Sequence, residues 1–424
     1  MPAAQETLAN GMNVTTIAGG HGNVCGVHLG LAIGPDRVPP HKAGLRAVTQ
    51  QVLLRLLTSG IAEREDLAGL RQEAGAGGGM RVEMQADYVE LAASVTTEAL
   101  EPLLSLLSSS VFAADWTEDD VVAAKESLAD AGGETAGNIS AAAQLHSLFQ
   151  RALWGDTVWT RPVWGTPQTR DQITLADVRG FYETYYVPNL ASLCIVTPFA
   201  ESEALRMVTE AFGRHEPRQV AAPAPFAGTV TSSRVETDMN LAVESAMLLV
   251  GVPLPPVGSD GFVRGMVAYG ALSGAGGLLA SDKTIATGLT LADRIGGSSV
   301  SPIDVMPVSL TSHPCLAVIA RAVPTAVEST REGILRHILG LAEAPLTQEQ
   351  LQRAKLRAIN LNALAADGPE SLATVRNRMH LVGATATDSE TFSARVMAVT
   401  AEDLQSFAAE QFTRHGIGLL LPEG

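Results

Sequence analysis

An internal repeat constrains the fold of this chain more than any other feature of its sequence. The segment Thr174–Phe181 (TLADVRGF) recurs as Thr400–Phe407 (TAEDLQSF), and Thr117–Val121 (TEDDV) recurs as Thr347–Leu351 (TQEQL). The two offsets are 400 − 174 = 226 and 347 − 117 = 230 residues. Two independent matches at nearly the same offset indicate that the chain contains one unit of about 210 residues twice.

The repeat predicts two similar domains joined by a linker. We expect an N-terminal domain at residues 1–214 and a C-terminal domain at residues 229–424. The stretch between them, residues 215–228 (HEPRQVAAPAPFAG), has the Pro- and Ala-rich composition of a linker. A chain of 424 residues is long enough to give each domain its own hydrophobic core.

Each half carries the same succession of strand and helix signals. Near the start, apolar and β-branched runs at residues 24–33 and 246–252 are typical of sheet strands. At the end, residues 177–197 and 403–421 each predict a helix followed by a strand. Strands and helices mix without strict alternation, which favours the α+β class over a doubly wound parallel sheet.

Composition and charge narrow the class of partner. Lys and Arg number 29 against 45 Asp and Glu, so the formal net charge is −16, which argues against a nucleic acid or an anionic membrane as the main partner. The chain has no apolar stretch long enough to span a membrane, and no basic residue of a secretory signal precedes Arg37. Its three cysteines show no CxxC spacing. We therefore expect a cytoplasmic protein.

Several segments together resemble a known family. Residues 161–167 (RPVWGTP) and 173–189 (ITLADVRGFYETYYVPN) are similar to a signature of the insulinase/pitrilysin-type zinc peptidases. The similarity is to the short two-domain branch that includes the mitochondrial processing peptidase and its bacterial relatives. Residues 346–355 and 399–403 resemble two further segments of that branch. The resemblance implies two α+β domains that form a half-clamshell, with a second such chain closing the chamber.

In that family the first helix carries an HxxEH motif, in which two His side chains bind Zn²⁺ and the Glu is the general base. When the chain is aligned on the family's Gly-Leu pair at Gly44-Leu45, the two His positions are Ala47 and Gln51 and the base position is Gln50. A methyl group and two neutral amides cannot bind Zn²⁺ in this way or accept a proton from water. The resemblance therefore implies a non-catalytic member.

The family's third zinc ligand, a Glu on a later helix, is also missing. In the best register its position is Ala131, and a shift of one residue would bring Asp130 there instead. A single carboxylate is not a zinc site. We expect no metal cofactor in this chain, and the resemblance implies that zinc is bound by a partner chain.

The resemblance also implies two peptide-binding elements. One is the strand at residues 80–87, which follows the Gly-rich run 75–79 and corresponds to the strand on which the family lays its peptide substrates. The other is a Gly-rich turn in the second half, with Gly274, Gly276 and Gly277. The family's substrate-holding Arg and Tyr are replaced by Thr284 and Leu291, and Arg294 is the nearest candidate for a substitute.

Two hypotheses of different class follow. In the first, the chain is the non-catalytic subunit of a heterodimeric zinc metallopeptidase that processes peptides or precursor and leader peptides. The partner supplies HxxEH, and this chain closes the chamber and helps to bind the substrate. In the second, the chain is a purely structural scaffold or a peptide-binding protein with no role in proteolysis. We prefer the first, and in neither is the chain catalytic by itself.

Overall fold

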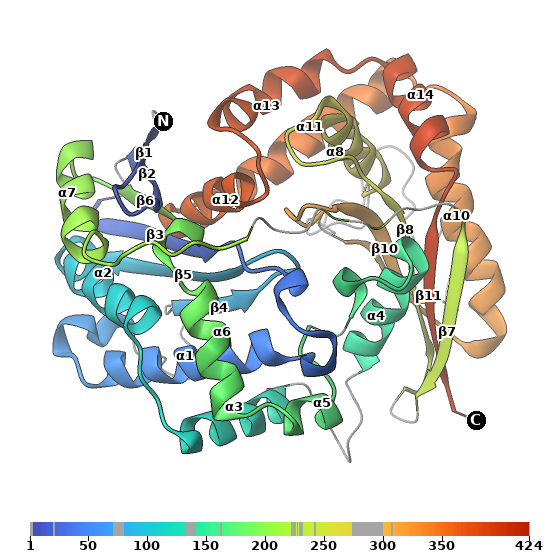
Figure 1. Cartoon of the computed structure of the whole chain (residues 1–424). Coiled ribbons are helices and arrows are strands. Elements are labelled where there is room, and N and C mark those ends of the chain that lie inside the picture. Colours follow the sequence, from blue (N-terminus) through green and yellow to red (C-terminus); the bar gives the residue numbers. More distant parts are fainter. Residues whose placement is uncertain are drawn as a thin grey trace. The chain divides into compact units, whose positions relative to one another are not determined.

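A computed structural model describes most of the chain, in two compact units (Figure 1). The described residues are 3–19, 22–70, 80–131, 141–161, 163–221, 226, 228, 232–240, 243–273, 300–306 and 308–423. Unit 1 consists of the segments Met1–Gly137, Pro162–Pro225 and Ala363–Ala386. Unit 2 consists of the segments Asn138–Arg161, Phe226–Asn362 and Thr387–Gly424.

Unit 1 is built on a six-stranded sheet with the order β1-β2-β6-β3-β5-β4. The strands are β1 (Ala3–Thr7), β2 (Asn13–Ala18), β3 (Val24–Leu31), β4 (Met80–Met84), β5 (Val89–Thr96) and β6 (Ala191–Thr197). Neighbouring strands are antiparallel, except that β2 and β6 are parallel. The central strands β3 and β6 are buried along almost their whole length, which explains their continuous apolar sequences.

Helices cover both faces of this sheet. They are α1 (Leu45–Ala62), α2 (Thr97–Phe112), α3 (Glu118–Ala131), α5 (Pro167–Asp171), α6 (Leu175–Tyr185), α7 (Glu201–Phe212) and α12 (Pro369–Leu381). Residues of α1, α2, α3, α6 and α7 share one hydrophobic core with one face of the sheet. The helix α12 packs on the other face, along β3 and β6.

Unit 2 has a five-stranded sheet with the order β7-β11-β8-β10-β9. The strands are β7 (Arg234–Asn240), β8 (Ala246–Pro253), β9 (Val300–Val305), β10 (Cys315–Ala322) and β11 (Gly416–Pro422). The helices are α4 (Ala141–Trp154), α8 (Asp260–Leu272), α10 (Val327–Glu343), α11 (Gln348–Leu364), α13 (Ala386–Ala398) and α14 (Ala401–Gln411). None of the helices in the described parts of the chain is long and apolar enough to cross a membrane.

The two sheets confirm the predicted duplication and the α+β class. When β1 is left out, the order β2-β6-β3-β5-β4 matches β7-β11-β8-β10-β9 strand for strand, and β7 pairs in parallel with β11 as β2 does with β6. The repeated sequences begin equivalent helices. Thr174 caps α6 and Thr400 caps α14, and each hydroxyl accepts a hydrogen bond from the backbone N–H of the Asp three residues later.

The units do not follow the sequence halves 1–214 and 229–424 throughout, because two equivalent helices are exchanged. The helix α4 belongs to the first half of the sequence but packs on the sheet of unit 2, against β11, β7 and β8. The helix α12 belongs to the second half but packs on the sheet of unit 1. Each sheet is thus closed on one face by a helix from the other half of the sequence.

Candidate functional site

The start of α1 is fixed by the segments that carry the family resemblance. Gly44 precedes the helix with φ +96°, and Gly165 has φ +69°. A Cβ on Gly165 would lie 2.3 Å from the carbonyl oxygen of Ala43, so only glycine allows this approach. Nearby, Lys42 Nζ lies 2.7 Å from Oδ2 of Asp177, the capping carboxylate of α6. The signature thus positions the helix on which the family places its zinc motif.

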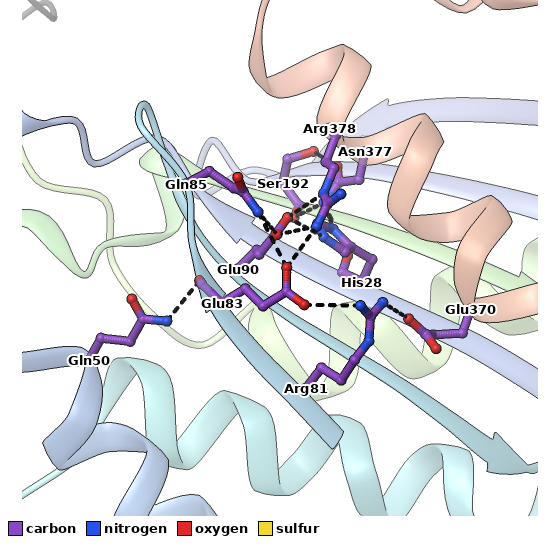
Figure 2. Close-up of polar contacts among 10 residues, drawn as sticks. All are labelled: His28, Gln50, Arg81, Glu83, Gln85, Glu90, Ser192, Glu370, Asn377 and Arg378. Atoms are coloured by element: carbon purple, nitrogen blue, oxygen red, sulfur yellow. Dashed lines mark hydrogen bonds and ion pairs between the residues drawn. The ribbon is translucent and has the colours of Figure 1, made fainter. Parts of the chain in front are cut away.

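The three motif positions lie on the first turns of α1, where the chain buries neutral side chains. Ala47 is only 2% exposed and packs in the core of unit 1. Gln50 is 9% exposed, and its Nε2 donates a hydrogen bond of 2.7 Å to the backbone oxygen of Glu83 on β4 (Figure 2). Its Oε1 is buried and accepts no hydrogen bond from the part of the chain that the structure describes. Gln51 is half-buried.

One turn before Gln50, the buried Arg46 binds the same hairpin. Its guanidinium donates hydrogen bonds to the backbone oxygens of Gln85 (2.8 Å), Ala86 (2.9 Å) and Ile33 (2.7 Å). Burial lowers the pKa of Arg46 to about 10, so the group remains charged at neutral pH. Arg46 and Gln50 together hold the β4–β5 hairpin against α1 through its backbone. The face of α1 that would bind zinc in the family thus holds the β4–β5 hairpin in this chain.

The donor set at these positions does not fit zinc. Ala47 offers a methyl group, and the Nε2 of Gln50 is a donor whose position is fixed by the Glu83 carbonyl. Zinc sites in proteins use Cys, His and carboxylate ligands, none of which is present at positions 47, 50 or 51. No step of metal-dependent hydrolysis can be assigned to these residues.

The strand β4 forms the outer edge of its sheet next to α1. The N–H of Gln85 donates to the oxygen of Tyr88 at the hairpin turn, and hydrogen-bonded pairs alternate along an antiparallel ladder. The backbone groups of Glu83 therefore point toward β5, and those of Val82 and Met84 point to the open edge. Among the described residues no strand pairs with this edge, so an extended peptide could pair with its donors and acceptors.

A buried charge network lies behind this edge, where α12 crosses the sheet (Figure 2). Glu90 of β5 is 4% exposed and accepts hydrogen bonds from His28 Nε2 (2.9 Å), from Arg378 Nε (2.9 Å) and Nη2, and from Gln85 Nε2 (3.0 Å). Burial alone would raise the pKa of Glu90, but the hydrogen bonds from His28 and Arg378 outweigh it and hold the pKa at about 2. Glu90 is therefore charged, and Arg378 compensates its charge.

The ring of His28 lies between Glu90 and Asn377. Nδ2 of Asn377 lies within hydrogen-bond distance of three acceptors, the backbone oxygens of Ser192 (2.8 Å) and His28 (3.1 Å) and Nδ1 of His28 (2.8 Å), and shares its two hydrogens among them, while its Oδ1 accepts from Ser192 Oγ. The charged carboxylate of Glu90 can only accept, so Nε2 of His28 carries the proton and Nδ1 of the neutral ring is an acceptor. Burial also lowers the pKa of His28, which favours the neutral ring. His28 is therefore a buried histidine with a hydrogen-bond partner at each ring nitrogen.

The outer part of the network reaches the edge strand. Glu83 of β4 lies 3.1 Å from Arg378 Nη2 and 3.0 Å from Arg81 Nη1, and Arg81 also pairs with Glu370 of α12. These side chains are more exposed than Glu90, so each pair contributes little stability by itself. Their arrangement connects α12 to the edge of the sheet.

Several of the sequence-predicted positions are not described. Ala131 is the last residue of α3, and its side chain, like that of Asp130, lies outside the described residues. The predicted peptide-binding residues Gly274, Gly276, Gly277 and Arg294 also lie outside them. Their roles stay predictions.

Comparisons with known proteins place the chain. Residues 172–357 match the family described as "Peptidase M16 inactive domain". Just under half of the chain is therefore similar to the M16 peptidases. The word "inactive" in that description refers to the matched domain. The loss of HxxEH is a separate observation, made at positions 47 to 51 of α1. No curated protein sequence matched the chain.

Solved structures share the M16 fold over the whole chain. A protease from Helicobacter pylori has a TM-score of 0.79 at 16% identity, and the match covers 99% of both chains. A putative M16-like peptidase from Alicyclobacillus acidocaldarius has a TM-score of 0.74 at 17% identity, covering 100% of this chain and 98% of that one. A chain of Complex III2 from Candida albicans has a TM-score of 0.77 at 16% identity, covering 98% and 95%. At these identities the likeness concerns the fold.

Proposed function

We propose that this chain is the non-catalytic subunit of a heterodimeric zinc metallopeptidase that processes peptides or precursor and leader peptides. The partner chain supplies HxxEH and the zinc ion, and this chain closes the chamber and helps to bind the substrate. The complex is cytoplasmic in this proposal. The observation that carries it is the state of α1, where Gln50 replaces the general base and its amide holds the backbone of β4.

The contacts that position α1 are retained although the zinc motif is lost. This supports a role in a complex over loss of function altogether. Gly165 still packs on the loop before α1, and Arg46 and Gln50 bind the β4–β5 hairpin through three backbone hydrogen bonds. Arg46 makes a fourth to Ile33, two residues after the end of β3. The helix α1 and the edge strand β4 are thus held in place although the HxxEH residues are missing.

Peptide binding is assigned to the open edge of β4 and to the Gly-rich turn. An extended peptide would pair with the N–H and C=O groups of Val82 and Met84 by strand addition. Gly274, Gly276 and Gly277, with Arg294, are also proposed to bind substrate peptide.

The decisive experiment is copurification of the tagged chain from its source cell and identification of the bound protein. We expect an HxxEH protein of similar length. The purified partner should cleave model peptides at least about tenfold faster when this chain is added, and the mixture should elute at about the sum of the two masses. Equal cleavage with and without this chain would remove the accessory role.

A variant of the edge strand tests the peptide-binding part. Val82→Pro removes one outward N–H of β4 and leaves the pairing with β5 intact, because the groups of Val82 do not point toward β5. We expect the complex to form as before and its KM for peptide to rise about fivefold or more. The control is Val122→Thr, a substitution of an exposed residue of α3. It should leave the KM for peptide unchanged.

The alternative is a scaffold or peptide-binding protein of the same fold with no role in proteolysis. The similarity to a chain of Complex III2 from Candida albicans favours it, since that chain has the fold at a TM-score of 0.77. In that case the copurified protein would lack HxxEH, and no mixture would gain peptidase activity.

A further inference from the structure

The strand β7 of unit 2 is an edge strand whose outer side is open. It pairs in parallel with β11, from Arg234 opposite Gly416 to Asn240 opposite Pro422. Among the described residues, no strand pairs with its other side. The helix α4 packs on one of its faces.

Unit 1 shows what can occupy such an edge. The strand equivalent to β7 is β2, which pairs in parallel with β6 on one side and antiparallel with β1 on the other. The sheet of unit 2 has no described counterpart of β1. The duplicated unit therefore contains a strand-accepting edge that is filled in unit 1 and open in unit 2.

The direction of the backbone groups on β7 follows from two hydrogen bonds. The N–H of Arg234 donates to the oxygen of His415, and the oxygen of Asn240 accepts from the N–H of Glu423, so the even-numbered residues of β7 point toward β11. The N–H and C=O groups of Val235, Thr237 and Met239 therefore point to the open edge. An added strand would pair with these three residues.

The side chains of the same three residues lie on the face away from α4, and two of them are exposed apolar groups. Val235 is 47% and Met239 is 50% exposed. On the equivalent strand β2, Val14 is only 2% exposed and packs in the core of unit 1 with residues of α7. An added strand with apolar side chains on this face would cover Val235 and Met239.

The other face of β7 carries Arg234, Glu236 and Asp238. Glu236 lies 3.7 Å from Arg151 of α4, an exposed pair, and Asp238 accepts a hydrogen bond from the neutral Gln144 (2.7 Å). Within the described residues no cation lies within 4 Å of Asp238. A basic side chain opposite Asp238 on an added strand would therefore meet an uncompensated negative charge.

A second copy of the chain fits this edge badly. Two copies of β7 that pair antiparallel about Thr237 would place Glu236 directly opposite Asp238 of the other copy, twice over. Pairing about Glu236 instead would place the two Glu236 residues opposite each other, although Arg234 would then face Asp238. Like charges directly opposite each other destabilise a strand pair, and both chains carry a net charge of −16. The charge of the edge thus favours a different protein.

We propose that the outer edge of β7 binds an extended segment of a partner protein as an antiparallel strand, in which apolar residues cover Val235 and Met239 and alternate with Lys or Arg residues facing Glu236 and Asp238. This binding surface does not depend on the function proposed above, because the partner bound here and a peptidase subunit can be different proteins.

Fluorescence anisotropy with the full chain tests the proposal, using a fluorescein-labelled nonapeptide of alternating Lys and Val. Residues directly opposite each other in an antiparallel pair share a face, so the Val residues of the peptide would make the hydrogen bonds to Val235, Thr237 and Met239. We expect saturable binding. N-methylation of the Val residues should weaken it by about tenfold or more, and N-methylation of the Lys residues should leave it unchanged.

Two measurements locate the site on the chain. Hydrogen exchange of the amides of Val235, Thr237 and Met239 should slow when the Lys/Val peptide is added. Val235→Lys should weaken binding about tenfold, whereas Val323→Lys, which adds the same charge at a residue of equal exposure (46%), should have a much smaller effect.

Three results would overturn the proposal. Equal binding of the two N-methylated peptides would mean that charge attraction alone holds the peptide. Absence of saturable binding, or unchanged exchange at the three amides, would mean that the edge accepts no strand. Self-association of the purified chain that Val235→Lys abolishes would make a second copy the occupant.

Discussion

Replacing Arg378 with Met should destabilise unit 1 by about 3–5 kcal/mol at pH 7, because it leaves a buried carboxylate without its cation. Glu90 is 4% exposed, and among the described residues Arg378 is the one permanently charged group that donates to it. Its remaining donors would be the neutral His28 and Gln85. Met matches the length of the Arg stem, so packing along α12 is largely kept.

The pH dependence gives an independent magnitude for the same interaction. The network holds the pKa of Glu90 at about 2 rather than its ordinary 4.5, which is worth about 3 kcal/mol. Since the folded pKa is the lower one, this stability is fully present above about pH 5 and is lost as the pH falls toward 2. The difference between wild type and Arg378→Met should therefore narrow by about 1 kcal/mol between pH 7 and pH 4.

Urea denaturation followed by circular dichroism at both pH values measures these effects. The matched control is Arg376→Met, two residues earlier on α12, whose Nη1 makes no hydrogen bond to the described residues. We expect the control substitution to lower the free energy of unfolding by less than about 1 kcal/mol. In the double variant Arg378→Met/Glu90→Gln, removal of the buried charge should restore part of the loss.

The reasoning fails if Arg378→Met costs no more than the control. It also fails if Glu90→Gln gives no rescue in the double variant, since the loss would then come from packing and not from the unpaired charge.

Three further predictions follow from the fold and the site. Gln50→Glu should cost about 1–3 kcal/mol in urea denaturation, because a carboxylate would face the backbone carbonyl to which the amide now donates; equal stability of the two proteins would refute this. Gly165→Ala should lower the melting temperature by several degrees, whereas Gly180→Ala, at a helical position with open space, should leave it equal or raise it. Fragments 1–228 and 229–424 should each fail to fold alone but give a folded complex when co-expressed, as circular dichroism and size-exclusion chromatography would show; a cooperative melt of either isolated fragment would contradict this.

The sequence predicted the parts of the fold that depend on local patterns. The helix and strand expected within residues 177–197 are the end of α6 and β6 (Ala191–Thr197), and the apolar run at 246–252 is β8, which ends one residue later. The repeated TLAD and TAED segments predicted equivalent positions, and both are helix N-termini. These features depend on residues within a few positions of each other, so the order of residues alone reveals them.

The exchange of α4 and α12 and the charge network could not be predicted in this way. Asn377 and His28 are separated by 349 positions, and Arg378 and Glu90 by 288. A single Glu in an apolar strand and a single Arg in an ordinary helix give no spacing signal that links them. The positions of the missing zinc motif, by contrast, could be found from the sequence, because the family resemblance supplied a register that starts at Gly44.

The reciprocal exchange of two equivalent helices has a consequence for the origin of the chain. A half-length ancestor with the same packing would have left one face of its sheet without the helix that now comes from the other half. Such an ancestor would have had to form a domain-swapped dimer, in which the helix of each subunit packed on the sheet of the other. Gene duplication and fusion would then have joined two subunits that already depended on each other to fold. Either half could afterwards lose its catalytic residues and still supply the helix that covers the sheet of the other half.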